Sequence, residues 1–130
     1  MNIGRRIFIT GATVVAAMGP RAFAATDGGH GMYGLIGKMT AQEGQRDALV
    51  KVLIEGVAGM PGCMSYVVAN DPTDPDLIWI TEAWESKEAH ASSLSLPSVR
   101  AAIAKGRPLI AGMTAVAETM PVGGHGLTRA

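Results

Sequence analysis

Residues 77–90 read LIWITEAWESKEAH and describe a strand that leads directly into a helix. The first part of this stretch alternates in character, as expected of a strand whose side chains point to opposite faces in turn. One face carries Ile78, Ile80, Glu82 and Trp84, and the other carries Leu77, Trp79, Thr81 and Ala83. Ser86 then suits the cap of a helix through His90, because a serine side chain accepts a hydrogen bond from a free backbone N–H of the first turn. Both faces of the strand have apolar surface to bury.

The sequence before residue 77 predicts three further elements. A strand pattern covers 32–39, an amphipathic helix pattern covers 45–57, and a second strand pattern covers 63–69. The helix follows a capping-box pattern over 40–43, and turn-forming residues fill 70–76. These elements would place a strand, a helix and a strand ahead of the strand at 77–85.

The sequence after residue 90 completes the pattern. Pro97 suits the first turn of a second helical piece, and 112–120 is expected to form the last strand. The whole order predicts an α+β fold with both helices on one face of an antiparallel sheet. The other face needs a cover, and for so small a domain the simplest one is a second copy packed sheet to sheet about a two-fold axis. We therefore expect a homodimer.

Composition narrows the classes of function. The chain has 130 residues, eleven basic and eleven acidic residues, and one cysteine. This length fits one domain. A single cysteine excludes an internal disulfide, and no Cys/His pairs have the spacing of a zinc site. A net charge of zero lacks the basic excess of nucleic-acid-binding proteins, so no nucleic-acid partner is expected.

The first 24 residues have the layout of an export signal. Arg5 and Arg6 precede Phe8 and a mildly apolar run, which resembles a twin-arginine signal peptide, and 22–24 fit a small-x-small cleavage site. A retained membrane anchor is the alternative, but the apolar run is shorter than the roughly 20 residues that span a bilayer. We expect export through the twin-arginine (Tat) machinery, cleavage after Ala24, and a periplasmic or secreted bacterial protein.

The mature chain is expected to have a Gly-rich lead over 25–31, a folded domain over 32–122 and a flexible Gly-rich tail over 123–130. Cleavage removes three arginines and leaves eight basic residues against eleven acidic ones, a net charge of −3. It also removes both phenylalanines. The aromatic side chains left to contact a planar ligand are Tyr33, Tyr66, Trp79 and Trp84.

The stretch 79–90, followed by LSLP at 94–97, is similar to the family of antibiotic biosynthesis monooxygenases and their quinol-monooxygenase relatives. In that family a strand ends in an E-x-W-x-S pattern, here Glu82 to Ser86, and a helix with a Leu-x-x-Pro stretch follows. PGCMSY at 61–66 resembles the start of the family's second strand.

Gly44-Gln45 also resembles the start of the family's first helix, so the resemblance covers about 33–122. It implies a ferredoxin-like βαββαβ sheet that forms a dimeric α+β barrel. Some members of the family oxidise polycyclic phenols or quinols with O₂ and no metal or flavin, others degrade haem, and others have no proven activity. Fold alone does not choose among them. The haem-degrading members need an asparagine in the first strand, and 33–39 contains none.

The resemblance also assigns roles to single positions. Trp84 is the tryptophan of the motif, and His90 stands where the polyketide-oxidising members have a catalytic tyrosine. Three positions depart from the pattern of active members: Ile80 replaces an asparagine, and Ser93 and Ser98 replace histidines. These departures favour a protein that kept the fold and lost the chemistry.

His90 and Trp84 are the candidate catalytic residues. An imidazole can accept a proton near neutrality, so His90 would be a general base for a phenolic or quinol proton, and a solvated surface histidine is the alternative. Trp84 would stack an aromatic substrate, and a core tryptophan is the alternative.

Tyr66, Asn70 and Glu82 are the candidate substrate-binding residues. Tyr66 and Asn70 share a strand face and would orient a substrate oxygen, although Asn70 also suits the turn that follows. Glu82 facing a cavity would have a raised pKa and act as a base. At a dimer seam it would instead pair with a basic residue, for which the candidates are Arg100, Lys105 and Arg107.

Three further features are weaker candidates for chemistry. Cys63 is interpreted as a small buried residue, because no basic residue lies nearby in sequence to lower its pKa. The acidic loop over 71–76 has two prolines and no EF-hand spacing, which favours a solvated turn over a calcium site. We expect no metal and no cofactor. A transition-metal site from His30 and His125, which would meet where the first and last strands lie side by side, is the alternative.

The sequence, together with this resemblance, predicts an exported, homodimeric, cofactor-independent monooxygenase-like protein that oxidises a small aromatic or quinol-type molecule with O₂. The alternative is a non-catalytic, ligand-binding or stress-related dimeric barrel.

Overall fold

The computed structural model describes residues 31–127. The expected signal peptide, its cleavage position, nearly all of the lead and His30 lie outside these residues. The elements follow in the order β1 (Tyr33–Ala41), α2 (Arg46–Gly56), β2 (Cys63–Asn70), β3 (Leu77–Trp84), α3 (Lys87–Ser93), α4 (Pro97–Gly106), the 3₁₀ turn η1 (Arg107–Leu109) and β4 (Ile110–Thr119).

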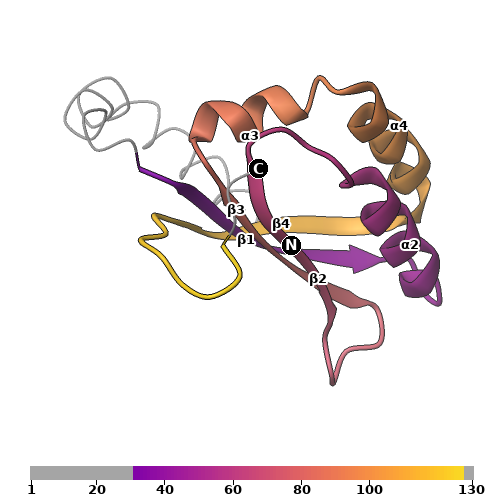
Figure 1. The fold of residues 1–130 in the computed structure, drawn as a ribbon. Helices are drawn as coiled ribbons and strands as arrows, with labels where there is room; N and C mark the ends of the chain where they lie inside the picture. The colour runs from indigo at the N-terminus through magenta and orange to yellow at the C-terminus, as the bar shows by residue number, and fades with distance from the viewer. Residues whose placement is uncertain (1–30, 128–130) are drawn as a thin grey trace, which may run out of the picture. The chain divides into compact units, whose positions relative to one another are not determined.

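The four strands form one antiparallel sheet in the order β2-β3-β1-β4. Figure 1 shows α2, α3 and α4 on the same face of this sheet. The predicted ferredoxin-like βαββαβ fold is therefore confirmed, with its second helical part divided into α3 and α4, the latter beginning at Pro97. Within residues 31–127, no helix combines the length and the apolar character needed to cross a membrane.

The aliphatic core lies between the sheet and α2. Leu49 of α2 is fully buried against Ile78 of β3, and Met39, Ala41 and Ile80 complete the buried cluster. Gly56 lets α2 approach α4 closely, because a Cβ at this position would collide with the Cβ of Ala102. This packing covers the half of β3 that precedes Glu82 and leaves the other half to α3.

The predicted capping box at 40–43 is wrong. Thr40 pairs with Leu77 inside the sheet, and β1 runs on to Ala41, whose N–H donates to the Asp76 carbonyl at 2.8 Å. Helix α2 begins only at Arg46, with no side-chain hydrogen bond at its N-cap. The cross-strand bonds hold residue 40 extended, so the local motif does not form.

A helix cap and contacts with the segment before β2 hold helix α3 in place. The Ser86 side chain accepts a hydrogen bond from the Ala89 N–H at 3.0 Å, which confirms the predicted cap. The Glu85 N–H donates to the Gly62 carbonyl at 2.8 Å, where β2 is about to begin. Gly62 has a φ of +80°, and a Cβ there would lie 2.6 Å from the Cβ of Ala89. Only glycine therefore allows α3 to lie this close to the 61–63 segment.

We predict that Gly62→Ala destabilises the fold more than Gly59→Ala. Both glycines have positive φ, at +80° and +71°, but a Cβ at Gly59 meets nothing within 4 Å. Gly59→Ala is expected to lower the free energy of unfolding by about 1–2 kcal/mol from backbone strain alone. Gly62→Ala should add about 1–3 kcal/mol from the contact with Ala89. Urea unfolding of both variants measures this, and equal losses would contradict the proposed packing of α3.

Candidate functional site

Three strands and one helix bring ionisable and aromatic side chains together at one end of the sheet. In the register of the strands, Trp84 lies opposite Tyr33 on β1, and Glu82 lies opposite Tyr66 on β2. They lie on the helix-covered face, because Glu82 and Trp84 alternate in step with the core residues of β3. Helix α3 adds a histidine above them. We call Tyr33, Tyr66, Glu82, Trp84 and His90 the Glu82–His90 cluster.

Glu82 is the central charged group of the cluster. Its side chain is 10% exposed, and its Oε1 accepts a hydrogen bond from the Trp84 indole N–H at 2.9 Å. The same oxygen lies 3.7 Å from His90 Nε2. Burial raises the pKa of the Glu82 carboxyl, while the Trp84 hydrogen bond and the His90 charge act in the opposite direction. The carboxylate is thus held in place by two residues that share its face of the sheet.

His90 is enclosed rather than solvated. Its side chain is 22% exposed, and its ring centroid lies 5.3 Å from that of Trp84 and 5.4 Å from that of Tyr33. Its backbone is fixed on both sides: the His90 N–H donates to the Ser86 carbonyl at 3.3 Å, and the Ser93 hydroxyl donates to the His90 carbonyl at 2.6 Å. The alternative of a surface histidine therefore does not describe this residue.

Trp84 has the geometry of a core tryptophan. It is 1% exposed, and its one polar atom is used by Glu82. A ligand could stack on its ring only if neighbouring side chains moved, so the stacking role stays a prediction. The Trp84 indole N–H instead donates a hydrogen bond that fixes the Glu82 carboxylate.

Both tyrosines of the cluster have raised pKa values. Burial raises the pKa of the Tyr66 phenol, and the charge of Glu82 adds to this effect. Burial also raises the pKa of Tyr33 to about 12, with contributions from Glu118 and Glu82. The Glu118 carboxylate that contributes to this shift pairs with Lys87 at 3.7 Å. No sequence pattern predicted that Tyr33 lies beside His90, although its position opposite Trp84 follows from the pairing of β1 with β3.

The remaining sequence candidates lie elsewhere or have structural roles. Asn70 is exposed and lies opposite Ile78, at the other end of β2 from the cluster. Ile80 belongs to the aliphatic core, and Ser93 is buried and bonded to the His90 carbonyl. Ser98 is exposed on α4. Of these four, only Ser93 contacts the Glu82–His90 cluster, and it does so through the backbone carbonyl of His90.

Cys63 lies beside the cluster. It is partly buried, opposite Trp84 in the sheet, and its Sγ donates to the Ser65 carbonyl at 3.6 Å. Burial raises the pKa of the thiol, and Glu82 raises it further. The thiol is therefore no activated nucleophile, in agreement with the sequence interpretation.

The acidic loop is an ordered turn. Asp71 accepts hydrogen bonds from Thr73, from the Asp74 N–H and from the Trp79 indole N–H, the last at 2.8 Å, and these bonds lower the pKa of its carboxyl. Arg46 donates to the carbonyls of Asp71 and Asp74 at 3.1 and 2.8 Å. This role of Arg46 was not predicted. In the described part of the chain, no group of three His, Cys, Asp or Glu side chains could hold a metal ion. His125 is exposed, and because His30 lies outside the described residues the alternative metal site stays a prediction.

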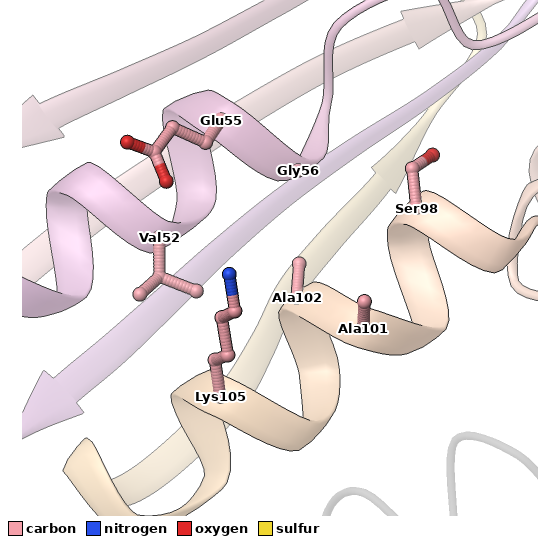
Figure 2. A pocket seen from close by; sticks show the side chains of 7 residues that line it. All are labelled: Val52, Glu55, Gly56, Ser98, Ala101, Ala102 and Lys105. Carbon is pink, nitrogen blue, oxygen red and sulfur yellow. The ribbon is translucent and has the colours of Figure 1, made fainter.

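Two hollows lie away from the cluster. Figure 2 shows the first, of about 80 Å³, where Val52 of α2 faces Ala102 and Lys105 of α4. The second, of about 420 Å³, lies where α2 begins, beside the 75–76 turn. Neither is lined by a residue of the Glu82–His90 cluster.

The fold and its motif define the class of this protein. A family model described as antibiotic biosynthesis monooxygenase matches residues 32–105, which include the whole Glu82–His90 cluster. The chain belongs to this family. No curated protein matches it.

Solved structures agree with this assignment. A candidate antibiotic biosynthesis monooxygenase from Chloroflexus aurantiacus J-10-fl is 66% identical, with a TM-score of 0.70, over 75% of this chain and 99% of that chain. One from Caulobacter crescentus CB15 is 23% identical, with a TM-score of 0.59, over 70% of this chain and 86% of that chain. One from Nitrosomonas europaea is 15% identical, with a TM-score of 0.65, over 70% of this chain and 90% of that chain. The last two show likeness of fold alone.

We predict that the native protein shows almost no tyrosinate absorbance at pH 10.5. The chain has two tyrosines, and the pKa values of both are raised, that of Tyr33 to about 12. Because each phenol is more acidic in the unfolded chain, this contribution to stability is present below about pH 10 and is lost as the pH rises through the folded pKa values. Absorbance at 295 nm, followed with and without urea, measures the effect. If the tyrosines titrated near pH 10 while the circular dichroism of the native fold was retained, the burial of the cluster would be contradicted. The Tyr33→Phe variant reports on Tyr66 alone.

Proposed function

We propose that this protein is a cofactor-independent monooxygenase that oxidises a small aromatic or quinol-type substrate with O₂, with His90 as the general base. The observation that carries the proposal is the partly buried His90 ring, which lies against the rings of Tyr33 and Trp84 with its Nε2 3.7 Å from the buried Glu82 carboxylate. A histidine beside a carboxylate is a common arrangement for proton abstraction.

The orientation of the imidazole suggests how the proton would move. Glu82 faces Nε2, which favours the tautomer that carries its hydrogen on this nitrogen and leaves the lone pair of Nδ1 to accept a substrate proton. Trp84 holds the carboxylate in position through its indole N–H. Proton transfer to His90 would make the pair an imidazolium and a carboxylate, and their attraction would shorten the 3.7 Å separation.

The substrate itself would supply the electrons for O₂. An anthrone illustrates the balance: loss of a C–H proton to His90 gives an electron-rich carbanion, which combines with O₂ to form a peroxide. Loss of water from the peroxide forms the quinone carbonyl, so that one oxygen atom stays in the product and the other leaves with both substrate hydrogens. The protein would provide the base, the orientation and an enclosed environment.

The proposal includes export and a homodimer. The twin-arginine pattern at Arg5 and Arg6 supports a periplasmic or secreted protein. The helix-free face of the sheet supports the dimer, since Val67 on this face is 52% exposed and lies in the same cross-strand row as Ile36. A second copy packed on this face would bury both residues.

We expect His90→Ala to lower the rate of O₂ uptake with hydroquinones or anthrones by at least about a hundredfold, the usual contribution of a positioned general base. An oxygen electrode measures the rate, and chromatography identifies the product. His125→Ala removes an exposed histidine outside the cluster and should leave the rate unchanged. Equal rates in the His90 variant and the wild type would refute the proposed role of His90.

Val67→Asp is expected to shift the protein from dimer to monomer, because it places a charge on the helix-free face where the second copy would pack. Ile54→Asp is the matched control, since Ile54 is a similarly exposed aliphatic residue, at 56%, on α2. Sedimentation velocity across a concentration series distinguishes the two species. A wild-type monomer, or a Val67→Asp variant that stays dimeric, would overturn the proposed interface.

A second candidate function is a non-catalytic ligand-binding or stress-related domain. The 1% exposure of Trp84 favours it, as do the two hollows, which lie away from His90. Binding of an aromatic ligand without O₂ uptake, in wild type and His90→Ala alike, would support this function over the monooxygenase.

A further inference from the structure

The negative charge of Glu82 is not balanced by a lysine or an arginine in the described part of the chain. Among residues 31–127, the polar contacts of its carboxylate come from the Trp84 indole and from His90, and no lysine or arginine forms an ion pair with it. In its role as a proton acceptor His90 is neutral before the reaction, and in that state its imidazole does not compensate the charge. The charge is also 90% removed from solvent, where its field is screened less than that of a surface carboxylate.

The other charges near the cluster do not offset it. Lys87 is the cation nearest to Tyr33, with its Nζ 5.7 Å from the ring centroid, and it already pairs with Glu118 at 3.7 Å. Both partners of this pair are nearly half exposed, and their opposite charges cancel at a distance. A ligand that reaches His90 therefore enters a region of net negative charge.

Three neighbouring groups respond to this field. Tyr33, Tyr66 and Cys63 lie on two different strands, and Glu82 raises the pKa of all three by disfavouring a second negative charge. These groups flank β3, the strand of Glu82, from β1 and from β2. An anionic ligand group would meet the same repulsion.

We propose that Glu82 is a specificity-determining residue, which admits uncharged or cationic aromatic ligands to the Glu82–His90 cluster and excludes aromatic carboxylates, sulfonates and phosphates. This inference rests on the proposed function in one respect, namely that the ligand binds at the cluster. Exclusion by an unpaired like charge is an effective source of discrimination between ligands of equal shape.

The field can be measured without any ligand, because Cys63 is the only cysteine of the chain and is partly exposed. Its thiolate attacks the sulfenyl sulfur of a methanethiosulfonate, forms a mixed disulfide and releases methanesulfinate. We compare the rates at pH 8.0 for a cationic trimethylammonioethyl reagent and an anionic sulfonatoethyl reagent. The ratio of the two rates cancels the thiolate fraction and reports the local potential.

Glu82→Gln should lower this cation-to-anion rate ratio by on the order of fivefold, from the loss of one nearby charge. Glutamine keeps an oxygen that can accept the Trp84 hydrogen bond, so the fold should be preserved, as circular dichroism checks. Glu55→Gln removes the same charge from an exposed site on α2 and should leave the ratio unchanged. A ratio that is the same in wild type and Glu82→Gln would overturn the proposal.

A second experiment measures by calorimetry the Kd of three ligands: hydroquinone, its sulfonate and its aminomethyl derivative. The wild type should bind the sulfonate at least tenfold more weakly than hydroquinone, and Glu82→Gln should remove most of this difference. Equal binding of all three by the wild type would overturn the specificity role. If none binds while Glu82→Gln still changes the thiol rate ratio, the field at Glu82 is supported, and both the ligand specificity and the proposed function fail.

Discussion

The central strand β3 imposes the constraint on which the rest of the domain depends. Its inward positions follow one another every second residue, and they change from Ile78 and Ile80 to Glu82 and Trp84 along a single face. The first pair lies under α2 and forms the aliphatic core. The second pair lies where α3 begins and carries the polar contacts. One strand thus provides both the stability of the fold and the position of the candidate site.

The Glu82–His90 cluster buries a charged group, and this has a cost in free energy. Removing a carboxylate from water is costly unless donors replace the lost solvent, and among residues 31–127 the groups recorded against the Glu82 carboxylate are one indole N–H and one imidazole. Buried charges of this kind are enriched at functional sites, which is consistent with the family to which the chain belongs.

The sequence was sufficient for the fold because the relevant signals are local. Alternation along 77–84, the Ser86 cap and Pro97 each depend on residues within one turn or one strand. Local signals also misled at 40–43, where pairing with β3 overrode a helix-capping pattern. The prediction that Tyr66 and Asn70 share a strand face was correct. Four residues of strand, however, separate their Cα atoms by roughly 13 Å, so that only Tyr66 reaches Glu82. The contact of Tyr33 with His90 and the bonds from Arg46 connect distant parts of the chain, and no local pattern encodes them.

The bonds of Arg46 and Asp71 also affect the opposite face of the sheet. Asp71 holds the Trp79 indole N–H, while Lys38 lies 5.4 Å from the centroid of the Trp79 ring. A tryptophan fixed in this way has already lost its rotational freedom in the folded chain. Any surface that docks on the helix-free face would therefore contact a preorganised aromatic ring, and association would proceed without the entropic cost of ordering that side chain.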